Sequence, residues 1–211
     1  MTKSQWISKL TYRIEHLAVR AGIFYHITSH YYRDVIKREI RLANITERDH
    51  VLCIGGGACP FSAILLHQTS SAKVTVIDNN SDCILKARQL VDRLGMNEHI
   101  RLLCQDGGSA ELSLSEYSVV HFALQVSPAE HVFSQIKNRA APGTKLLIRR
   151  PKKSLGKMYC ALRSSIQDQC QKASHRTICN IGSTLLYVKQ EDMAFCGSDD
   201  VDCAFSGSVA V

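Results

Sequence analysis

The sequence Val51-Leu52-Cys53-Ile54-Gly55-Gly56-Gly57, followed later by Val74-Thr75-Val76-Ile77-Asp78, decides the fold of this chain. Each apolar run is short and rich in valine and isoleucine, which is typical of a buried strand. The glycines let the chain turn sharply into a helix, and without Cβ atoms they let a ligand approach the backbone. Asp78, at the end of the second strand, offers oxygens to both hydroxyls of a ribose. The stretch therefore predicts a βαβ unit that binds a ribose-containing ligand.

Strands and helices continue to alternate downstream of this unit. Helices are predicted over 61–68, 81–94 and 128–138, and strands over 100–104, 118–123 and 144–148. Ser81 is the expected N-cap of the second helix, and Gly95 follows its end. Such alternation predicts an α/β fold with a Rossmann-like, doubly wound and mostly parallel sheet.

The last third of the chain predicts a different arrangement. We expect a helix over 155–172 and then an antiparallel hairpin of strands 176–181 and 184–188, because Gly182-Ser183 is a turn signal. The sheet is therefore expected to end in an antiparallel hairpin.

Three segments are predicted from these patterns. Apolar residues at helical spacing predict two or three short helices between residues 4 and 42, so residues 1–48 form a short N-terminal helical segment. Residues 49–190 form the ligand-binding domain. Residues 191–211, acidic and rich in small residues, are expected to be a weakly ordered tail.

The composition restricts the function classes. The chain has 211 residues, of which 45% are hydrophobic, and its net charge is +7. No apolar run approaches the roughly 20 residues of a membrane span, and residues 1–10 lack the apolar centre of a secretory signal. The nine cysteines are an odd number without a Cys-x-x-Cys pair, which argues against a disulfide framework and a metal site. A cytoplasmic location is expected.

A basic segment stands out between residues 135 and 176. It holds eleven lysines and arginines against one acid, Asp168, and six of these bases lie between Lys145 and Lys157. The positive electrostatic field of residues 137–157 would attract an anionic acceptor or nucleic acid. The alternative is that these bases form only a solvated surface. Aromatic residues do not interleave with the bases, as they would in a platform for single-stranded nucleic acid.

The glycine loop separates two classes of ligand. A dinucleotide site requires a third glycine where this chain has Pro60, and proline lacks the N–H that a pyrophosphate would use. S-adenosylmethionine has no phosphate, so Asp78 would bind its ribose and Asp106, after the next strand, its adenine amino group. The predicted cofactor is therefore S-adenosylmethionine. The candidate cofactor-binding residues are Gly55, Gly56, Gly57, Asp78, Asn79, Asp106, Gly107 and Phe122.

With these motifs the chain resembles the Rossmann-like S-adenosylmethionine-dependent methyltransferases over residues 45–190. The resemblance implies a seven-stranded sheet whose last strand is antiparallel, with the cofactor at the carboxyl ends of the first strands. It also implies a transferase, in the first place a methyltransferase acting on a small-molecule acceptor. The acceptor itself stays open, because the fold hosts many substrates.

A narrower resemblance concerns the loop Gly57-Ala58-Cys59-Pro60-Phe61-Ser62-Ala63-Ile64. It is similar to the loop of the nicotianamine synthase family, which transfers an aminocarboxypropyl group instead of a methyl group. Upstream, Tyr31-Tyr32 and Glu39 resemble a tyrosine-rich helix of that family, in which a glutamate handles the acceptor amine. This alternative makes Glu39 and Tyr32 the candidate catalytic residues.

Other sequence features leave the chemistry open. His26, His30 and His121 are further candidate bases, although a histidine in an apolar strand such as His121 is also typical of a core residue. No Asn-Pro-Pro-Tyr motif follows the strand 118–123, which argues against transfer to a nucleic-acid base. A non-catalytic module that binds nucleic acid or protein through the basic segment is the alternative of another class.

Overall fold

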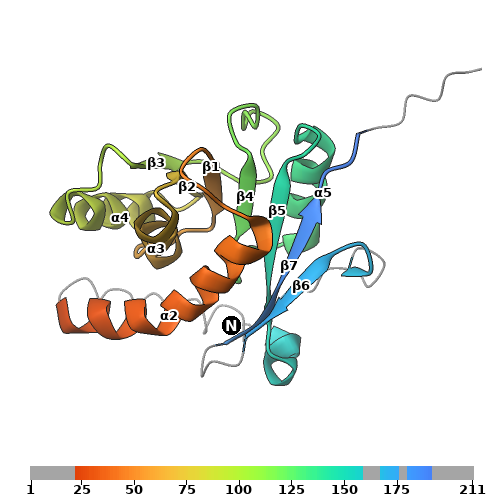
Figure 1. Ribbon diagram of the computed structural model, residues 1–211. Coiled ribbons are helices and arrows are strands. Elements are labelled where there is room, and N and C mark those ends of the chain that lie inside the picture. The colour runs from red at the N-terminus through yellow and green to blue at the C-terminus, as the bar shows by residue number, and fades with distance from the viewer. Residues whose placement is uncertain (1–21, 159–166, 176–179, 192–211) are drawn as a thin grey trace, which may run out of the picture.

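A seven-stranded sheet forms the centre of the computed structural model (Figure 1). The structure describes residues 22–158, 167–175 and 180–191, with residues 22–31 and 156–158 described by their backbone alone. The strands are β1 (His50–Ile54), β2 (Lys73–Asp78), β3 (Ile100–Cys104), β4 (Val119–Phe122), β5 (Lys145–Pro151), β6 (Gln171–Ser174) and β7 (Ile181–Val188). Their order is β3-β2-β1-β4-β5-β7-β6. Strands β1 to β5 pair in parallel, whereas β7 runs antiparallel to β5 and β6, so the predicted fold class is confirmed.

Helices cover both faces of the sheet. They are α2 (Gly22–Ala43), α3 (Phe61–Ser70), α4 (Ser81–Arg93) and α5 (Ala129–Arg139), with a short 3₁₀ helix, η1 (Lys153–Met158). One hydrophobic cluster joins α2, α3 and α4 to the sheet, and a second joins α5 and the segment 112–117 to the opposite face. This is a doubly wound arrangement.

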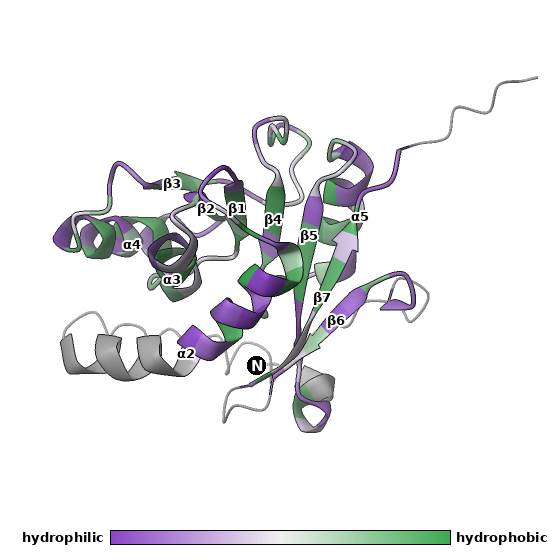
Figure 2. Cartoon of the chain, in the orientation of Figure 1, coloured by the Kyte–Doolittle hydropathy of each residue, from purple (hydrophilic) through white to green (hydrophobic). Residues whose placement is uncertain are grey.

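Successive side chains of a strand point to opposite faces of the sheet, which explains the two hydrophobic clusters. In β1, Val51 and Cys53 belong to the first cluster, whereas Leu52 and Ile54 belong to the second. Figure 2 shows hydrophobic residues concentrated in the central strands. Because helices cover both faces, the end of β1 from Val51 to Ile54 is apolar on both sides and does not alternate with polar residues.

The order of the strands places a crevice at the end of β1. The chain moves outward from β1 to β2 and β3 on one side, and from β4 to β5 on the other. The order therefore reverses between β1 and β4, and ligands of open α/β sheets bind at such a point, beyond the carboxyl ends of the strands.

The helical segment before the sheet is packed against it. Val35, Ile36 and Ala43 of α2 are buried, and Tyr32 and Ile40 pack against the first hydrophobic cluster, which includes Ile36 and Ala43. The described part of this segment is one helix that begins at Gly22, where the sequence predicts an interruption. Residues 1–21 and the predicted tail from residue 192 lie outside the described residues. No helix within the described ranges is long and apolar enough to cross a membrane.

The C-terminal third differs from the sequence-based prediction. Residues 159–166 of the predicted helix 155–172 and residues 176–179 of the predicted strand 176–181 lie outside the described residues. The described ends of the predicted helix are η1 and β6, and the hairpin pairs β6 with β7. The predicted turn Gly182-Ser183 lies inside β7. A Cβ atom on Gly182 would lie 3.0 Å from the carbonyl oxygen of Pro151, where the register between β5 and β7 shifts. Gly182 thus permits a close strand approach and makes no turn.

The N-terminus of α4 is a smaller correction. Asn80, and not Ser81, is the N-cap: its Oδ1 accepts hydrogen bonds from the backbone N–H groups of Asp82 and Cys83 at 2.9 and 3.2 Å. An amide oxygen satisfies two helix donors that would otherwise lack partners. The cap fixes the start of α4 directly after the end of β2.

Candidate functional site

The glycine loop after β1 is shaped by backbone conformation and by packing. Gly55 and Gly57 have φ angles of +78° and +63°, which side chains disfavour. Gly56 has another constraint, because a Cβ atom there would lie 2.1 Å from Cγ1 of Val76. The backbone N–H groups of Gly55 and Gly56 both donate to the carbonyl of Ile77, at 2.9 and 3.3 Å. The loop is therefore held tightly against the end of β2.

Asp78 connects this loop to the turn after β2. Its Oδ2 accepts a hydrogen bond from the N–H of Gly57 at 2.8 Å, and its Oδ1 accepts one from the N–H of Asn80 at 3.0 Å. An ionised carboxylate offers about four acceptor positions, so each oxygen keeps one for a further donor. Asn79 follows on the exposed surface.

Asp106 lies beyond the neighbouring strand. Strands β2 and β3 pair with Asp78 opposite Cys104, so both acids follow the same edge of the sheet. Asp106 is exposed, and its Oδ1 accepts from the N–H of Gly108 at 2.9 Å. A Cβ atom on Gly107 would meet Cγ2 of Ile54 at 2.5 Å, which explains that glycine by packing.

Phe122 occupies a different environment from the other candidates for cofactor binding. Its side chain is buried in the second cluster, and its ring centroid lies 6.1 Å from that of Phe133. Only its backbone, at the end of β4, is left to contact a cofactor.

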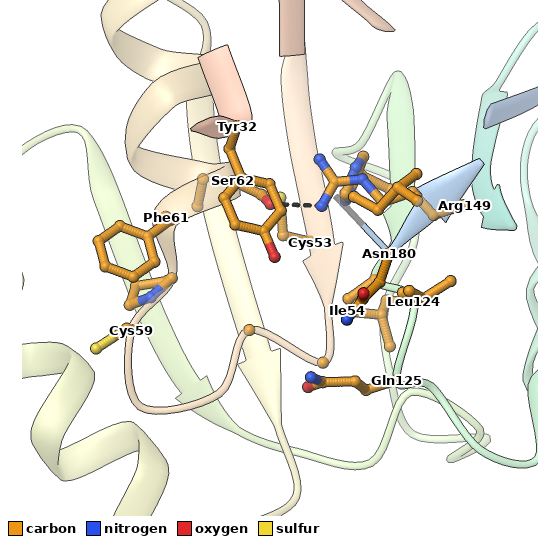
Figure 3. A pocket seen from close by; sticks show the side chains of 17 residues that line it. Tyr32, Cys53, Ile54, Cys59, Phe61, Ser62, Leu124, Gln125, Arg149 and Asn180 are labelled. Carbon is orange, nitrogen blue, oxygen red and sulfur yellow. Dashed lines mark hydrogen bonds between the residues drawn. The ribbon is translucent and has the colours of Figure 1, made fainter. Parts of the chain in front are cut away.

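A cavity of about 150 Å³ lies beside the glycine loop (Figure 3). Its lining residues come from α2, the loop after β1, the start of α3, the ends of β4 and β5, and the start of β7. They are Tyr32, Cys53, Ile54, Gly55, Gly56, Cys59, Pro60, Phe61, Ser62, Ala63, His121, Ala123, Leu124, Gln125, Arg149, Asn180 and Ile181. Of the predicted site residues, Tyr32, Gly55 and Gly56 thus line this cavity, whereas Gly57, Asp78, Asn79, Asp106, Gly107 and Phe122 do not.

Glu39 lies outside that lining, in a buried polar network. Both carboxylate oxygens accept from Arg149, Oε1 from Nε and Oε2 from Nη2, each at 2.8 Å. Oε1 also accepts from Thr184 Oγ1 at 2.6 Å, and Oε2 lies 3.3 Å from Nε2 of His121. Four donors therefore fill the acceptor positions of a side chain that is 0% exposed.

The network continues on the far side of Thr184. Its hydroxyl donates its one proton to Glu39, so it accepts from Nε2 of His175 at 2.8 Å. His175 is 6% exposed, and among the described residues its Nδ1 has no hydrogen-bond partner. Burial lowers the pKa of His175, which favours the neutral ring.

Charge and burial oppose each other at Glu39. Burial raises the pKa of the carboxyl, but the charge and hydrogen bonds of Arg149, together with those of His121, lower the pKa well below its ordinary value. A carboxylate with such a low pKa is a weak proton acceptor. Glu39 is therefore arranged to hold Arg149 and His121 in place.

Arg149 extends from this network into the cavity. Its Nη1 donates to Ser62 Oγ at 2.7 Å, and its Cζ lies 5.9 Å from the ring centroid of Tyr32. Figure 3 shows Tyr32, Ser62 and Arg149 gathered at one end of the cavity, with Gln125 at the other. Cys53 also lines the cavity, and burial raises the pKa of its thiol to about 12, so this thiol stays protonated.

Sequence reasoning missed several of these residues. Arg149 stands among the bases of the basic segment, where it reads as a surface charge, but it is 7% exposed and paired with Glu39. Thr184 and His175 carry no sequence motif. The available signal is Glu39 itself, an acid within the apolar stripe of α2, because a buried carboxylate requires a cation. The side chains of His26, His30 and Tyr31 lie outside the described part of α2.

Comparisons with known proteins agree with this architecture. A family model described as nicotianamine synthase protein matches residues 24–178. No curated protein matches the chain. Among solved structures, a glutamate-to-glutamine mutant of MtNAS in complex with S-adenosylmethionine superposes with a TM-score of 0.69 at 20% identity, covering 85% of this chain and 72% of that chain.

Methyltransferases share the same fold. An RNA methyltransferase from Salinibacter ruber, in complex with S-adenosyl-L-homocysteine, has a TM-score of 0.57 at 18% identity and covers 77% of this chain and 94% of that one. An S-adenosylmethionine-dependent O-methyltransferase from Thermotoga maritima has a TM-score of 0.60 at 11% identity, with coverages of 74% and 65%. Identities this low show the fold alone.

Proposed function

This chain belongs to the nicotianamine synthase family, and from that premise we propose that it transfers the aminocarboxypropyl group of S-adenosylmethionine to an amine of a small molecule. The family match and the methyltransferase-like fold confirm the broader expectation of an S-adenosylmethionine-dependent transferase. The observation that carries the proposal is the extent of the match. It begins at residue 24 and so includes Tyr32 and Glu39 of α2 together with the sheet.

We assign the adenosine part of the cofactor to the edge beyond β2 and β3. Asp78 has an acceptor position left on each oxygen for the ribose hydroxyls, and Asp106 is exposed beside it for the adenine amino group. Asn79 and Gly107 adjoin these acids. The methionine part of the cofactor would then pass Gly55, Gly56 and Gly57 toward the cavity.

The cavity suits the reacting end of the cofactor. At about 150 Å³ it is smaller than the roughly 300–1,000 Å³ of a site that encloses a whole ligand, so it would hold the aminocarboxypropyl group and the acceptor amine. Tyr32 and Arg149 line it at the end where α2 packs on the sheet. Glu39 would act from behind Arg149, as a positioning residue.

The reaction depends mainly on alignment. The sulfonium of S-adenosylmethionine is an activated leaving group, and holding the amine in line with the carbon under attack supplies on the order of 7–11 kcal/mol. Attack at the aminocarboxypropyl carbon bonded to sulfur releases methylthioadenosine. Attack at the methyl carbon releases S-adenosylhomocysteine.

Methyl transfer is the second candidate, because methyltransferases share this fold. The product separates the two reactions. The purified chain is incubated with S-adenosylmethionine, alone and with each of the twenty amino acids, and products are quantified by mass spectrometry. An enzyme-free incubation corrects for spontaneous decay of the cofactor.

Methylthioadenosine above the enzyme-free level, together with a product heavier by the aminocarboxypropyl group, is the expected result. S-adenosylhomocysteine with a methylated acceptor would establish methyl transfer instead. If calorimetry detects no binding of S-adenosylmethionine, both candidates are wrong.

A further inference from the structure

Resting on the proposed aminocarboxypropyl transfer, we propose that His121 is a catalytic residue that accepts the proton of the acceptor amine, and that Glu39 orients its ring. His121 is on β4, between Cys53 of β1 and Leu147 of β5 in the register of the sheet. It lines the cavity, whereas Glu39 does not. His121 therefore belongs both to the lining of the cavity and to the buried network.

The bond to Glu39 fixes the tautomer of the ring. Nε2 of His121 lies 3.3 Å from Oε2 of Glu39, and a carboxylate paired with Arg149 can only accept. Nε2 must therefore carry the hydrogen in the neutral ring. Nδ1 then carries the lone pair beside the backbone carbonyl of His121, which can accept a hydrogen bond from the ring once Nδ1 is protonated.

Other ionisable groups in the lining are poor proton acceptors. Arg149 keeps its charge, and the thiol of Cys53 stays protonated. Tyr32 and Cys59 carry a phenol and a thiol, neither of which has a basic nitrogen. Among the described residues of the lining, His121 therefore has the basic nitrogen best suited to the task.

The charges that face His121 favour a neutral ring before the reaction. Burial and the charge of Arg149 lower the pKa of His121, whereas Glu39 and the backbone of His121 itself raise it. After proton transfer, the imidazolium would be stabilised by the adjacent carboxylate of Glu39. The charge of Arg149 also disfavours an ammonium in the cavity, which promotes loss of the proton from the acceptor.

The acceptor ammonium gives one proton to Nδ1 of His121, and the lone pair left on its nitrogen attacks the aminocarboxypropyl carbon bonded to sulfur. The carbon–nitrogen bond forms as the carbon–sulfur bond breaks, and the bonding electrons pass to sulfur, giving neutral methylthioadenosine. The product keeps a secondary ammonium, and His121 later releases its proton to solvent.

The variant His121→Gln tests this role. Its side-chain amide can still donate to Glu39 but is not basic. We expect kcat for methylthioadenosine release to fall at least a hundredfold, with the Kd for S-adenosylmethionine unchanged. The acidic limb of the wild-type pH profile should also disappear. His99→Gln, which removes an exposed ring stacked on His67, is the matched control and should keep the wild-type rate and profile.

Retention of more than a tenth of kcat with the acidic limb intact in His121→Gln would overturn the role of His121. A chain that binds S-adenosylmethionine but releases no methylthioadenosine would instead overturn the proposed function. Nitrogen-detected NMR of the full chain, assigned by difference from His121→Gln, should show a neutral ring with the hydrogen on Nε2 at pH 7. An Nδ1–H tautomer or an imidazolium at that pH would overturn the inference without any activity measurement.

Discussion

Arg149 and Thr184 stand directly opposite each other in the register of strands β5 and β7, and both donate hydrogen bonds to the carboxylate of Glu39. The antiparallel pairing of β5 with β7 thus places hydrogen-bond donors around the buried carboxylate of Glu39 in α2. The guanidinium of Arg149 also donates a hydrogen bond to Ser62 at the start of α3. One side chain of β5 therefore connects α2, α3 and the lining of the cavity.

The Glu39–Arg149 pair should contribute strongly to stability. Glu39→Met and Arg149→Met each leave one buried charge without its partner, and we expect each to lower the free energy of unfolding by about 3–5 kcal/mol. The double variant should cost less than the sum of the two, which urea denaturation can measure. Additive losses would contradict a direct interaction.

Asp78 should determine affinity for the cofactor. Asp78→Ala removes the acceptors assigned to the ribose, and we expect it to weaken S-adenosylmethionine binding by about 1.5–3 kcal/mol. Isothermal calorimetry measures the change. Asp82→Ala is the matched control, because Asp82 is an exposed acid in the first turn of α4. Equal affinities for the two variants would remove the ribose assignment.

Nicotinamide dinucleotides should bind poorly. Pro60 precedes α3 at its N-cap position and has no N–H to offer a pyrophosphate. Competition titrations should show at least a tenfold preference for S-adenosylhomocysteine over NAD, equivalent to about 1.4 kcal/mol. Sub-micromolar affinity for NAD would contradict this reading of the loop.

Stability should fall as the pH is lowered from 7 to 5. The pKa values of His121 and His175 lie below their ordinary value of 6.5 in the folded chain, so below pH 6.5 the unfolded chain binds more protons. Each such histidine lowers the free energy of unfolding by at most about 1.4 kcal/mol for each pH unit. Below pH 4.5 the lowered pKa of Glu39 acts in the same direction. Urea titrations at several pH values should show a shallower decline for His175→Gln, and an unchanged decline would count against a neutral buried His175.

The basic segment should affect acceptor binding only if the acceptor is anionic. Arg149 is unsuitable for this test because it is buried, so the charges to reverse are Arg150 and the exposed Lys153. The double variant Arg150→Glu/Lys153→Glu should raise the acceptor KM several-fold at low salt, with less effect at high salt and no change in cofactor affinity. An unchanged KM at both salt concentrations would mark the segment as a solvated face.

Local patterns predicted much of the sheet. The runs that became β1, β2 and β3 are apolar and bounded by turns, and Gly55 and Gly57 have the left-handed conformations that a sharp turn requires. Gly182 was misread, because a glycine signals a turn in sequence and can equally permit a close approach of two strands. The N-cap was misplaced because Asn79, Asn80 and Ser81 offer equivalent polar groups.

The polar network could not be read from the sequence. Glu39 in an apolar stripe requires a cation, but many bases are available, and only the register of β5 with β7 selects Arg149. His121 and Thr184 lie 82 and 145 residues from Glu39 along the chain. Contacts of that separation follow from topology and leave no local pattern.

The separation of 145 residues between Glu39 and Thr184 also has a consequence for the folding of the chain during its synthesis. Closing a loop of that length costs conformational entropy before the contact can form. On a ribosome, α2 would be synthesised well before β7 could supply the last donor to its buried carboxylate. A nascent chain can therefore complete the hydrogen bonds to Glu39 only after β7 has been synthesised.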